Sequence, residues 1–349
     1  MIVIVIVPVT GRDHFPAAVV AAHGADPVGT AGAVALRARV VRRRRHTLCC
    51  ERRCVVRACD CFCLGTAMGE GEYRSGDVLI RRMRLEDADR VEAVALGGLG
   101  PHRAAGEEAE RRARALMRFA RYLEIDPGGQ WVAEIDGEVV GCANAIMREG
   151  LWGLGLFAVA SEHQGRGVGR RLLDAALAYG DGARGGWIMS SEDPGAMRRY
   201  ALAGFDLRPC VAAAGRLRAD LPAVEVDESS DLRATEPISR AVRGAAHGDD
   251  LAGLPGRLLT LPGGFAIHEE GSVRVLAALD DDTATRLLRA CFAQAPRGAT
   301  VQIDLLTAGQ EWAIRPCLEA GLALSPSGAV FTRGDVGPMR PYVPTGSWL

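Results

Sequence analysis

One short segment restricts the folds open to this chain more than any other, the run Gln-Gly-Arg-Gly-Val-Gly at residues 164–169. It follows an apolar stretch typical of a strand, 151–159, and precedes a stretch with helical periodicity, 168–179. Glycines let the main chain approach phosphate oxygens closely, and the N-terminus of a helix favours a negatively charged group. The segment therefore predicts a loop that binds the phosphates of a nucleotide-containing cofactor.

Two cofactor classes fit such a loop. A dinucleotide-binding unit would present the same strand, loop and helix, and Glu192 lies near the position of its ribose-binding acid. Three details disagree with that unit. The spacing is G-x-G-x-G and not G-x-G-x-x-G, five residues separate Val159 from Gly165, and two helices and three strands precede the loop. These details favour a different nucleotide-containing cofactor.

Composition excludes several classes of enzyme. The chain has no lysine, so all 42 of its basic residues are arginines. A Walker-type phosphate loop, a pyridoxal enzyme and a protein kinase each need a lysine. The net charge of −1 argues against nucleic acid as a partner of the whole chain. No apolar run reaches the roughly 18 residues of a spanning helix, so we expect no membrane partner and a cytoplasmic location.

The first 75 residues differ from the rest. They contain an arginine block at 42–45 and six of the ten cysteines, spaced C-C-x3-C-x4-C-x-C-x-C. This spacing lacks the paired C-x2-C knuckles of a structural zinc site, so we expect no metal. An arginine-rich DNA-binding arm is the competing interpretation. We expect residues 1–75 to be a disordered extension, or upstream sequence translated from a start codon placed too early.

From residue 78 the pattern predicts a mixed sheet of the order β-α-α-β-β-β-α-β-α-β. The expected strands and helices are 78–84, 86–96, 107–123, 130–135, 138–147, 151–159, 168–179, 187–191, 194–203 and 205 onward. A weaker copy of this order follows. Its elements are 224–226, 231–243, 265–269, 273–279, 283–294, 300–306, 310–320 and 329–333. At the position of the glycine loop this copy has three aspartates, 280–282, which would repel a pyrophosphate.

Residues 156–173, Leu-Phe-Ala-Val-Ala-Ser-Glu-His-Gln-Gly-Arg-Gly-Val-Gly-Arg-Arg-Leu-Leu, resemble the acetyl-CoA signature of the GNAT N-acetyltransferase superfamily. That signature is a strand ending in Val, a short turn, Gln/Arg-x-x-Gly-x-Gly/Ala and a helix. The order of elements from 78 to about 218 is also that of the superfamily. The whole of residues 76–349 resembles its tandem members, such as mycothiol synthase, in which one copy is active and the other degenerate.

The resemblance implies an α/β fold (an α+β mixed sheet) of two acyl-CoA N-acyltransferase-type domains in tandem. The catalytic copy would be residues 76–220 and the degenerate copy 221–349. The cosubstrate would be acetyl-CoA. The main chain of Phe157, Ala158 and Val159 would separate from the neighbouring strand and bind the pantetheine arm and the thioester oxygen. The other expected cofactor-binding residues, whose main chain would bind the pyrophosphate, are Gln164, Gly165, Arg166, Gly167, Val168 and Gly169.

Tyr200 is the expected catalytic residue. It lies four residues before Gly204, where many members place the tyrosine that protonates the departing thiolate, although a packed tyrosine is the plain alternative. Members often carry asparagine where this chain has Asp193, so that contact with the cofactor arm is open. The expected strand 151–159 has no acid for a general base. Glu149 or a chain of waters could take the role, and His163 reads as a solvent-facing loop residue.

The resemblance implies direct attack of a primary amine on the thioester, with Tyr200 as general acid. Because no covalent intermediate is needed, the scattered cysteines 142, 210, 291 and 317 read as core or surface thiols. The expected partner is a small-molecule or peptide amine, and the expected assembly is a monomer or homodimer. The alternative is a catalytically inactive acyl-CoA-binding or regulatory protein. The proline-stiffened tail, 341–349, would dock near the active site or pack on its own domain.

Overall fold

The structure is a computed structural model that describes residues 72–75, 77–99, 108–218 and 220–346. All of them belong to one compact unit, Cys63–Leu349. The arginine block and the cysteine cluster lie outside the described residues, as does most of the extension predicted for 1–75. The last four residues of that extension, 72–75, form a strand that pairs with the next one. No helix in the described part of the chain is long and apolar enough to cross a membrane.

The first half of the described chain has the predicted order of helices and strands, with one additional strand at its start. Its elements are β1 (Glu72–Ser75), β2 (Val78–Arg82), α1 (Ala88–Leu99), α2 (Glu108–Ile125), β3 (Gln130–Ile135), β4 (Glu138–Arg148), β5 (Leu151–Val159), α3 (Val168–Tyr179), β6 (Gly185–Ser190), α4 (Pro194–Leu202) and β7 (Asp206–Arg216). Asp136 and Gly137 both have positive φ, 49° and 82°, as the tight turn between β3 and β4 requires.

The second half repeats the order less regularly. Its elements are β8 (Asp227–Ser229), α5 (Glu236–Arg243), β9 (Arg257–Leu261), β10 (Gly264–Glu269), β11 (Ser272–Ala278), α6 (Asp281–Ala293), β12 (Thr300–Thr307), α7 (Glu311–Glu319), β13 (Ala323–Gly334) and β14 (Tyr342–Val343). The prediction missed β9 and β14 and placed the first strand at 224–226. These short segments lack the alternation of apolar and polar residues on which that prediction depends.

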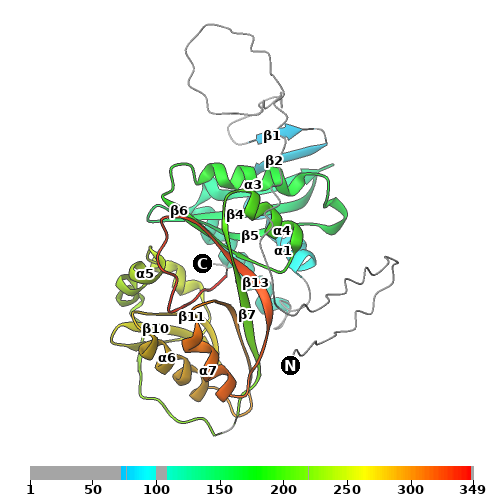
Figure 1. Cartoon of the computed structure of the whole chain (residues 1–349). Helices are drawn as coiled ribbons and strands as arrows, with labels where there is room; N and C mark the ends of the chain where they lie inside the picture. The colour runs from blue at the N-terminus through cyan, green and yellow to red at the C-terminus, as the bar shows by residue number, and fades with distance from the viewer. Residues whose placement is uncertain (1–71, 76, 100–107, 219, 347–349) are drawn as a thin grey trace, which may run out of the picture. The chain divides into compact units, whose positions relative to one another are not determined.

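The strands form two sheets. The larger has nine strands in the order β1-β2-β3-β4-β5-β6-β13-β7-β12, and the smaller has five in the order β14-β11-β10-β9-β8. The mixed α/β fold with mixed sheets is therefore confirmed. Strand β13, from the end of the chain, lies between β6 and β7, where Phe331 is opposite both Ile188 and Leu207. Figure 1 shows β7 and β13 side by side as two long strands. The second half thus completes the sheet of the first.

The two faces of the larger sheet carry different helices. Helices α3 and α4 cover one face, over a core that includes Trp152, Leu172 and Ile188. Helix α1 packs on the other face and α2 packs against α1, over a core that includes Phe119 and Trp187. Trp187 and Ile188 are neighbours in β6, and they point to opposite faces because side chains alternate along a strand. Helix α3, which follows the glycine loop, and the helices α1 and α2 therefore lie on opposite sides of the sheet.

Candidate active site

Strands β5 and β6 separate at the point where the resemblance requires it. They run parallel and pair from Leu151 to Leu154, where the last pair joins Leu154 to Ile188. Strand β5 nevertheless continues to Val159 and β6 to Ser190. The register of β5 against β4 shifts at Gly155, and such a bulge bends a strand. Residues 157–159 therefore stay paired with β4 while their other edge has no pair in β6.

The glycine loop follows directly, and its glycines act in two ways. Gly165 and Gly167 have φ of 75° and 82°, the left-handed region that favours glycine, and no atom lies within 4 Å of a Cβ built on either. A Cβ on Gly169 would lie 3.2 Å from Cζ of Phe157, so this glycine lets α3 approach β5 closely. The Gln164 side chain donates a hydrogen bond of 2.9 Å to the carbonyl of Val159 and ties the loop to the strand.

The N-terminus of α3 is open to an anion. Gly167 is its N-cap residue and no side chain caps it, so the first-turn N–H groups keep their positive end uncovered. The corresponding helix of the second half, α6, is closed. There the Asp280 carboxylate accepts hydrogen bonds of 2.8 Å from the main-chain N–H and from the hydroxyl of Thr283. The two copies therefore differ at the group that would receive the phosphates.

Tyr200 lies beside the separated end of β5. Its ring contacts Phe157 at 6.0 Å and Phe331 at 5.4 Å between centroids, both edge to face. The side chain is buried, 4% exposed, and its hydroxyl has no hydrogen-bond partner among the described residues. Burial, with a smaller contribution from Asp193, raises the pKa of Tyr200, so the phenol stays protonated at neutral pH. Gly204 closes the helix with φ of 84°, in the predicted register with Tyr200.

Three other residues that the sequence analysis considered for the active site are Asp193, Glu149 and His163. Asp193 caps α4 by accepting a hydrogen bond of 2.6 Å from the N–H of Ala196. Glu149 lies in the turn that precedes β5, at the end of the strand away from the glycine loop, so it is not placed to act as a general base. His163 is half-buried in the turn after β5, and its Nδ1 has no partner among the described residues.

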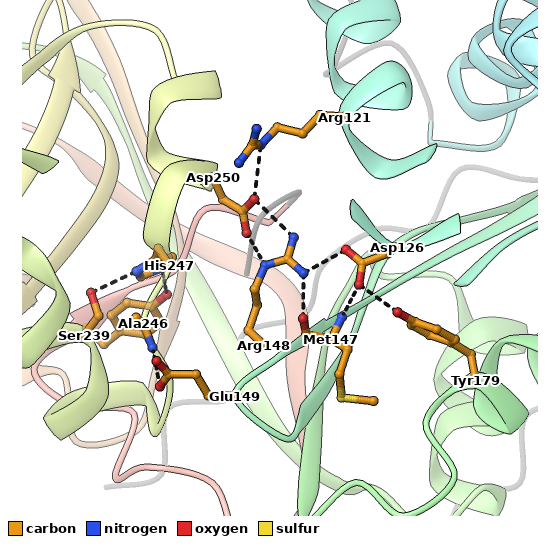
Figure 2. A network of polar contacts seen from close by, with 11 residues as sticks. Arg121, Asp126, Met147, Arg148, Glu149, Tyr179, Ser239, Ala246, His247 and Asp250 are labelled. Carbon is orange, nitrogen blue, oxygen red and sulfur yellow. Dashed lines mark hydrogen bonds and ion pairs between the residues drawn. The ribbon is translucent and has the colours of Figure 1, made fainter. Parts of the chain in front are cut away.

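A network of buried charges joins the two halves and was not predicted. Arg148, at the end of β4, donates to Asp126 at 2.7 Å and to Asp250 at 2.5 Å. Asp250 belongs to the turn Gly248–Gly253 of the second half, and Arg121 of α2 lies 3.4 Å from it. Figure 2 shows these four side chains converging, with the hydroxyl of Tyr179 on Asp126. The network fixes the second half against α2 and β4.

Glu149 adds a second contact between the halves. Its carboxylate accepts a hydrogen bond from Nε of Arg240 at 2.9 Å. It also accepts one from the N–H of Ala246 at 3.1 Å, which Figure 2 shows. The bond from Arg240 holds the pKa of Glu149 below its ordinary value, although partial burial acts in the opposite direction. The carboxylate is therefore engaged in structure.

The tail of the chain fills the matching position of the second half. Strand β14 pairs with β11, with Tyr342 opposite Ala277 and Val343 opposite Leu276, just before α6. This is the edge that β5 leaves unpaired in the first half. Gln310 holds the tail, because its Nε2 donates to the carbonyls of Met339 and Tyr342 at 3.0 and 2.9 Å. The described residues of the predicted tail, 341–346, therefore pack on the second half through Tyr342 and Val343.

The scattered cysteines are buried and free, as core thiols are. Burial raises the pKa of Cys142 to about 12, which removes its thiolate at neutral pH. Among the described residues, no group of three or more His, Cys, Asp or Glu side chains is arranged to hold a metal ion.

Comparisons with known proteins agree with this geometry. Residues 101–205 match the model of the Acetyltransferase (GNAT) family. No curated protein sequence matches the chain. A Pyrococcus horikoshii protein named provisionally as an acetyltransferase has a similar structure, with a TM-score of 0.65, 17% identity, and coverage of 79% of this chain and 95% of its own. The shared fold therefore extends over both halves.

Two other solved structures are more distant. A GCN5-related N-acetyltransferase from Sphaerobacter thermophilus is 14% identical, covers 78% of this chain and 99% of its own, and has a TM-score of 0.47. The PaiA N-acetyltransferase of Thermoplasma acidophilum, solved with coenzyme A, is 14% identical, covers 37% and 90%, and has a TM-score of 0.32. Residues 101–205 therefore match a GNAT acetyltransferase domain.

Proposed function

We propose that the protein is an acetyl-CoA-dependent N-acetyltransferase and that its active copy is the first, residues 76–220. The observation that carries the proposal is the separation of β5 from β6 beside an uncapped glycine loop. The unpaired edge of Phe157, Ala158 and Val159 would bind the pantetheine arm. The main-chain N–H groups of the loop would bind the pyrophosphate, and the exposed Arg166 adds positive charge.

The chemistry is direct acyl transfer. The nitrogen of a neutral primary amine attacks the thioester carbonyl, a new C–N bond forms, and the C–S bond breaks. An N–H group of residues 157–159 stabilises the oxyanion, and Tyr200 donates its proton to the thiolate. Because burial raises the pKa of Tyr200, the phenol carries its proton at neutral pH but donates it less readily than an unperturbed tyrosine would. We expect its contribution near the lower end of the roughly 10²–10⁴-fold that general acids supply.

The second copy is proposed to be inactive for two reasons that support each other. Asp280 covers the N-terminus of α6 with a carboxylate, which repels phosphate. Strand β14 pairs with the edge of β11 that a pantetheine arm would need. Residues 221–349 are then a degenerate copy whose contribution is structural. A monomer or homodimer in the cytoplasm that acts on a small-molecule or peptide amine remains the predicted setting.

The test is Tyr200→Phe with Tyr179→Phe as the matched control, measured by thiol release from acetyl-CoA with a panel of amines. The Tyr200 hydroxyl has no hydrogen-bond partner among the described residues, so its loss should lower kcat about 100-fold and change stability by less than about 1 kcal/mol. The Tyr179 hydroxyl bonds Asp126 at 2.9 Å, so the control should lose about 1 kcal/mol and keep its activity. Equal kcat in wild type and Tyr200→Phe contradicts the assigned role.

The alternative is an acyl-CoA-binding or regulatory protein without catalysis. One observation favours it: β5 carries no acidic residue, and Glu149 is engaged by Arg240. Calorimetric titration with acetyl-CoA separates the two functions. Binding without thiol release for any amine supports the alternative, and release with any amine excludes it.

A further inference from the structure

A cluster of buried hydrogen-bond donors lies where the second half meets the first. Arg243 is the last residue of α5 and is 0% exposed, and its Nε, Nη1 and Nη2 have no hydrogen-bond partner in the described part of the chain. Its guanidinium lies over the indole ring of Trp187 in β6, 4.7 Å from the ring centroid. Trp187 is also 0% exposed, and its Nε1 has no hydrogen-bond partner among the residues that the structure describes. The cluster therefore offers donors only.

Burying these donors without acceptors costs free energy of folding. Removing a cation from water without a counter-ion is strongly unfavourable, and stacking on an aromatic ring offsets only part of the cost. Other enclosed arginines of this chain have carboxylate partners, such as Arg81 with Asp87 at 2.8 Å and Arg148 with Asp250 at 2.5 Å. Burial lowers the pKa of Arg243, the sign expected for a cation that has lost water. A group that brings acceptor oxygens would relieve this cost.

We propose that Arg243 and Trp187 bind a carboxylate of the amine acceptor, an inference that rests on the proposed N-acetyltransferase function. A planar guanidinium matches a carboxylate with two parallel hydrogen bonds, and the indole N–H can add a third. The degenerate second half then contributes to acceptor specificity. Its helix α5 supplies Arg243 to the face of the larger sheet on which α1 packs.

The position of the cluster sets the length of the acceptor. Trp187 and Ala158 belong to the core on the same face of the sheet. Trp187 is opposite Gly153, and Ala158 lies five positions further along β5 (158 − 153), about 16 Å at 3.3 Å per residue. At the amine end, Asn144 is opposite Leu156 and is 0% exposed. Its Oδ1 has no hydrogen-bond partner among the described residues and could accept from an N–H group. The acceptor is therefore an extended amine with a distant carboxylate, such as a peptide of about three to six residues.

The first measurement tests the anion site without turnover. The thermal unfolding of the full chain is measured for wild type, Arg243→Met and the control Arg233→Met. The base buffer contains no chloride, and acetate, acetamide or chloride is added to it separately. Arg233 is exposed on the turn before α5, so the control removes the same charge elsewhere. Acetate should raise Tm of wild type and control by roughly 2 °C or more, and should not raise that of Arg243→Met; acetamide should have no effect.

The outcomes separate the possible occupants. Equal shifts in wild type and Arg243→Met, or equal effects of acetate and acetamide, overturn the carboxylate site. A chloride effect as large as that of acetate indicates a free-anion site and overturns the assignment to the acceptor. If Arg243→Met does not fold, Trp187→Phe replaces it. That variant keeps the aromatic face and loses the Nε1 donor, so the acetate-dependent rise should shrink, and an unchanged rise contradicts the proposal.

The second measurement follows acetylation of alanine peptides of increasing length, each as free carboxylate and as C-terminal amide. We expect kcat/KM to favour the carboxylate by about tenfold or more at the lengths that reach Arg243. Arg243→Met should abolish this preference, whereas the control Arg233→Met should retain it. A wild type that prefers neither form at any length contradicts the proposal. If no amine at all is acetylated, the proposed function fails, while the acetate measurement still decides the anion site.

Discussion

Asp250 links the second half to Arg121 and Arg148 of the first, and the cost of replacing it by alanine follows from these contacts. Its side chain is 2% exposed and bonds Arg148, itself only 12% exposed. Breaking a buried ion pair by removing one partner costs about 3–5 kcal/mol. Arg148 keeps Asp126, and Arg121 is 28% exposed and regains water. We therefore expect Asp250→Ala to lower the free energy of unfolding by about 2–4 kcal/mol.

Urea unfolding at neutral pH measures this loss, and Asp249→Ala is the matched control. Asp249 is exposed in the same turn, so its loss should cost less than about 0.5 kcal/mol. The double variant Arg148→Met/Asp250→Leu replaces the pair by apolar side chains and should recover part of the stability. If Asp250→Ala lost less than about 1 kcal/mol, or no more than the control, the network would not join the halves as argued.

Two further variants test the contacts that hold the second half. Glu149→Gln should be less stable than wild type near neutral pH. Because Arg240 lowers the folded-state pKa of Glu149, its contribution is present above the unfolded value and is lost as pH falls through the folded one, so the difference in unfolding curves should shrink steadily as the pH is lowered. Gln310→Leu should cost about 2–4 kcal/mol, because it leaves the buried main chain of the tail without partners, and it should speed amide exchange at Tyr342 and Val343. Unchanged exchange there would show that the pairing of β14 with β11 suffices to hold the tail.

Local chemistry explains why so much of the first half could be predicted. Periodicity within a segment marks α3 and β5, and the positive φ of Gly165 and Gly167 is a requirement of the loop itself. Tyr200 could be placed because its distance from Gly204 is fixed by one helix end. The resemblance added what the pattern could not give, namely the separation of β5 from β6 that the structure contains.

Other features depend on residues far apart in the chain. Glu149 looked available for catalysis because its sequence neighbours gave it no partner. Its partner Arg240 lies 91 residues away. The insertion of β13 between β6 and β7 follows from pairing between distant strands, and no local pattern in 323–334 specifies it.

The sequence by itself determined the class of fold, the order of elements in the first half and the glycine loop that opens α3, because each of these is a property of neighbouring residues. Only the tertiary structure decided that the halves share a sheet, that β14 occupies the edge of β11, and that Arg243 is buried on Trp187 with no carboxylate partner among the described residues. Burial and pairing are set by what packs against a residue, and packing brings together segments that the sequence keeps apart.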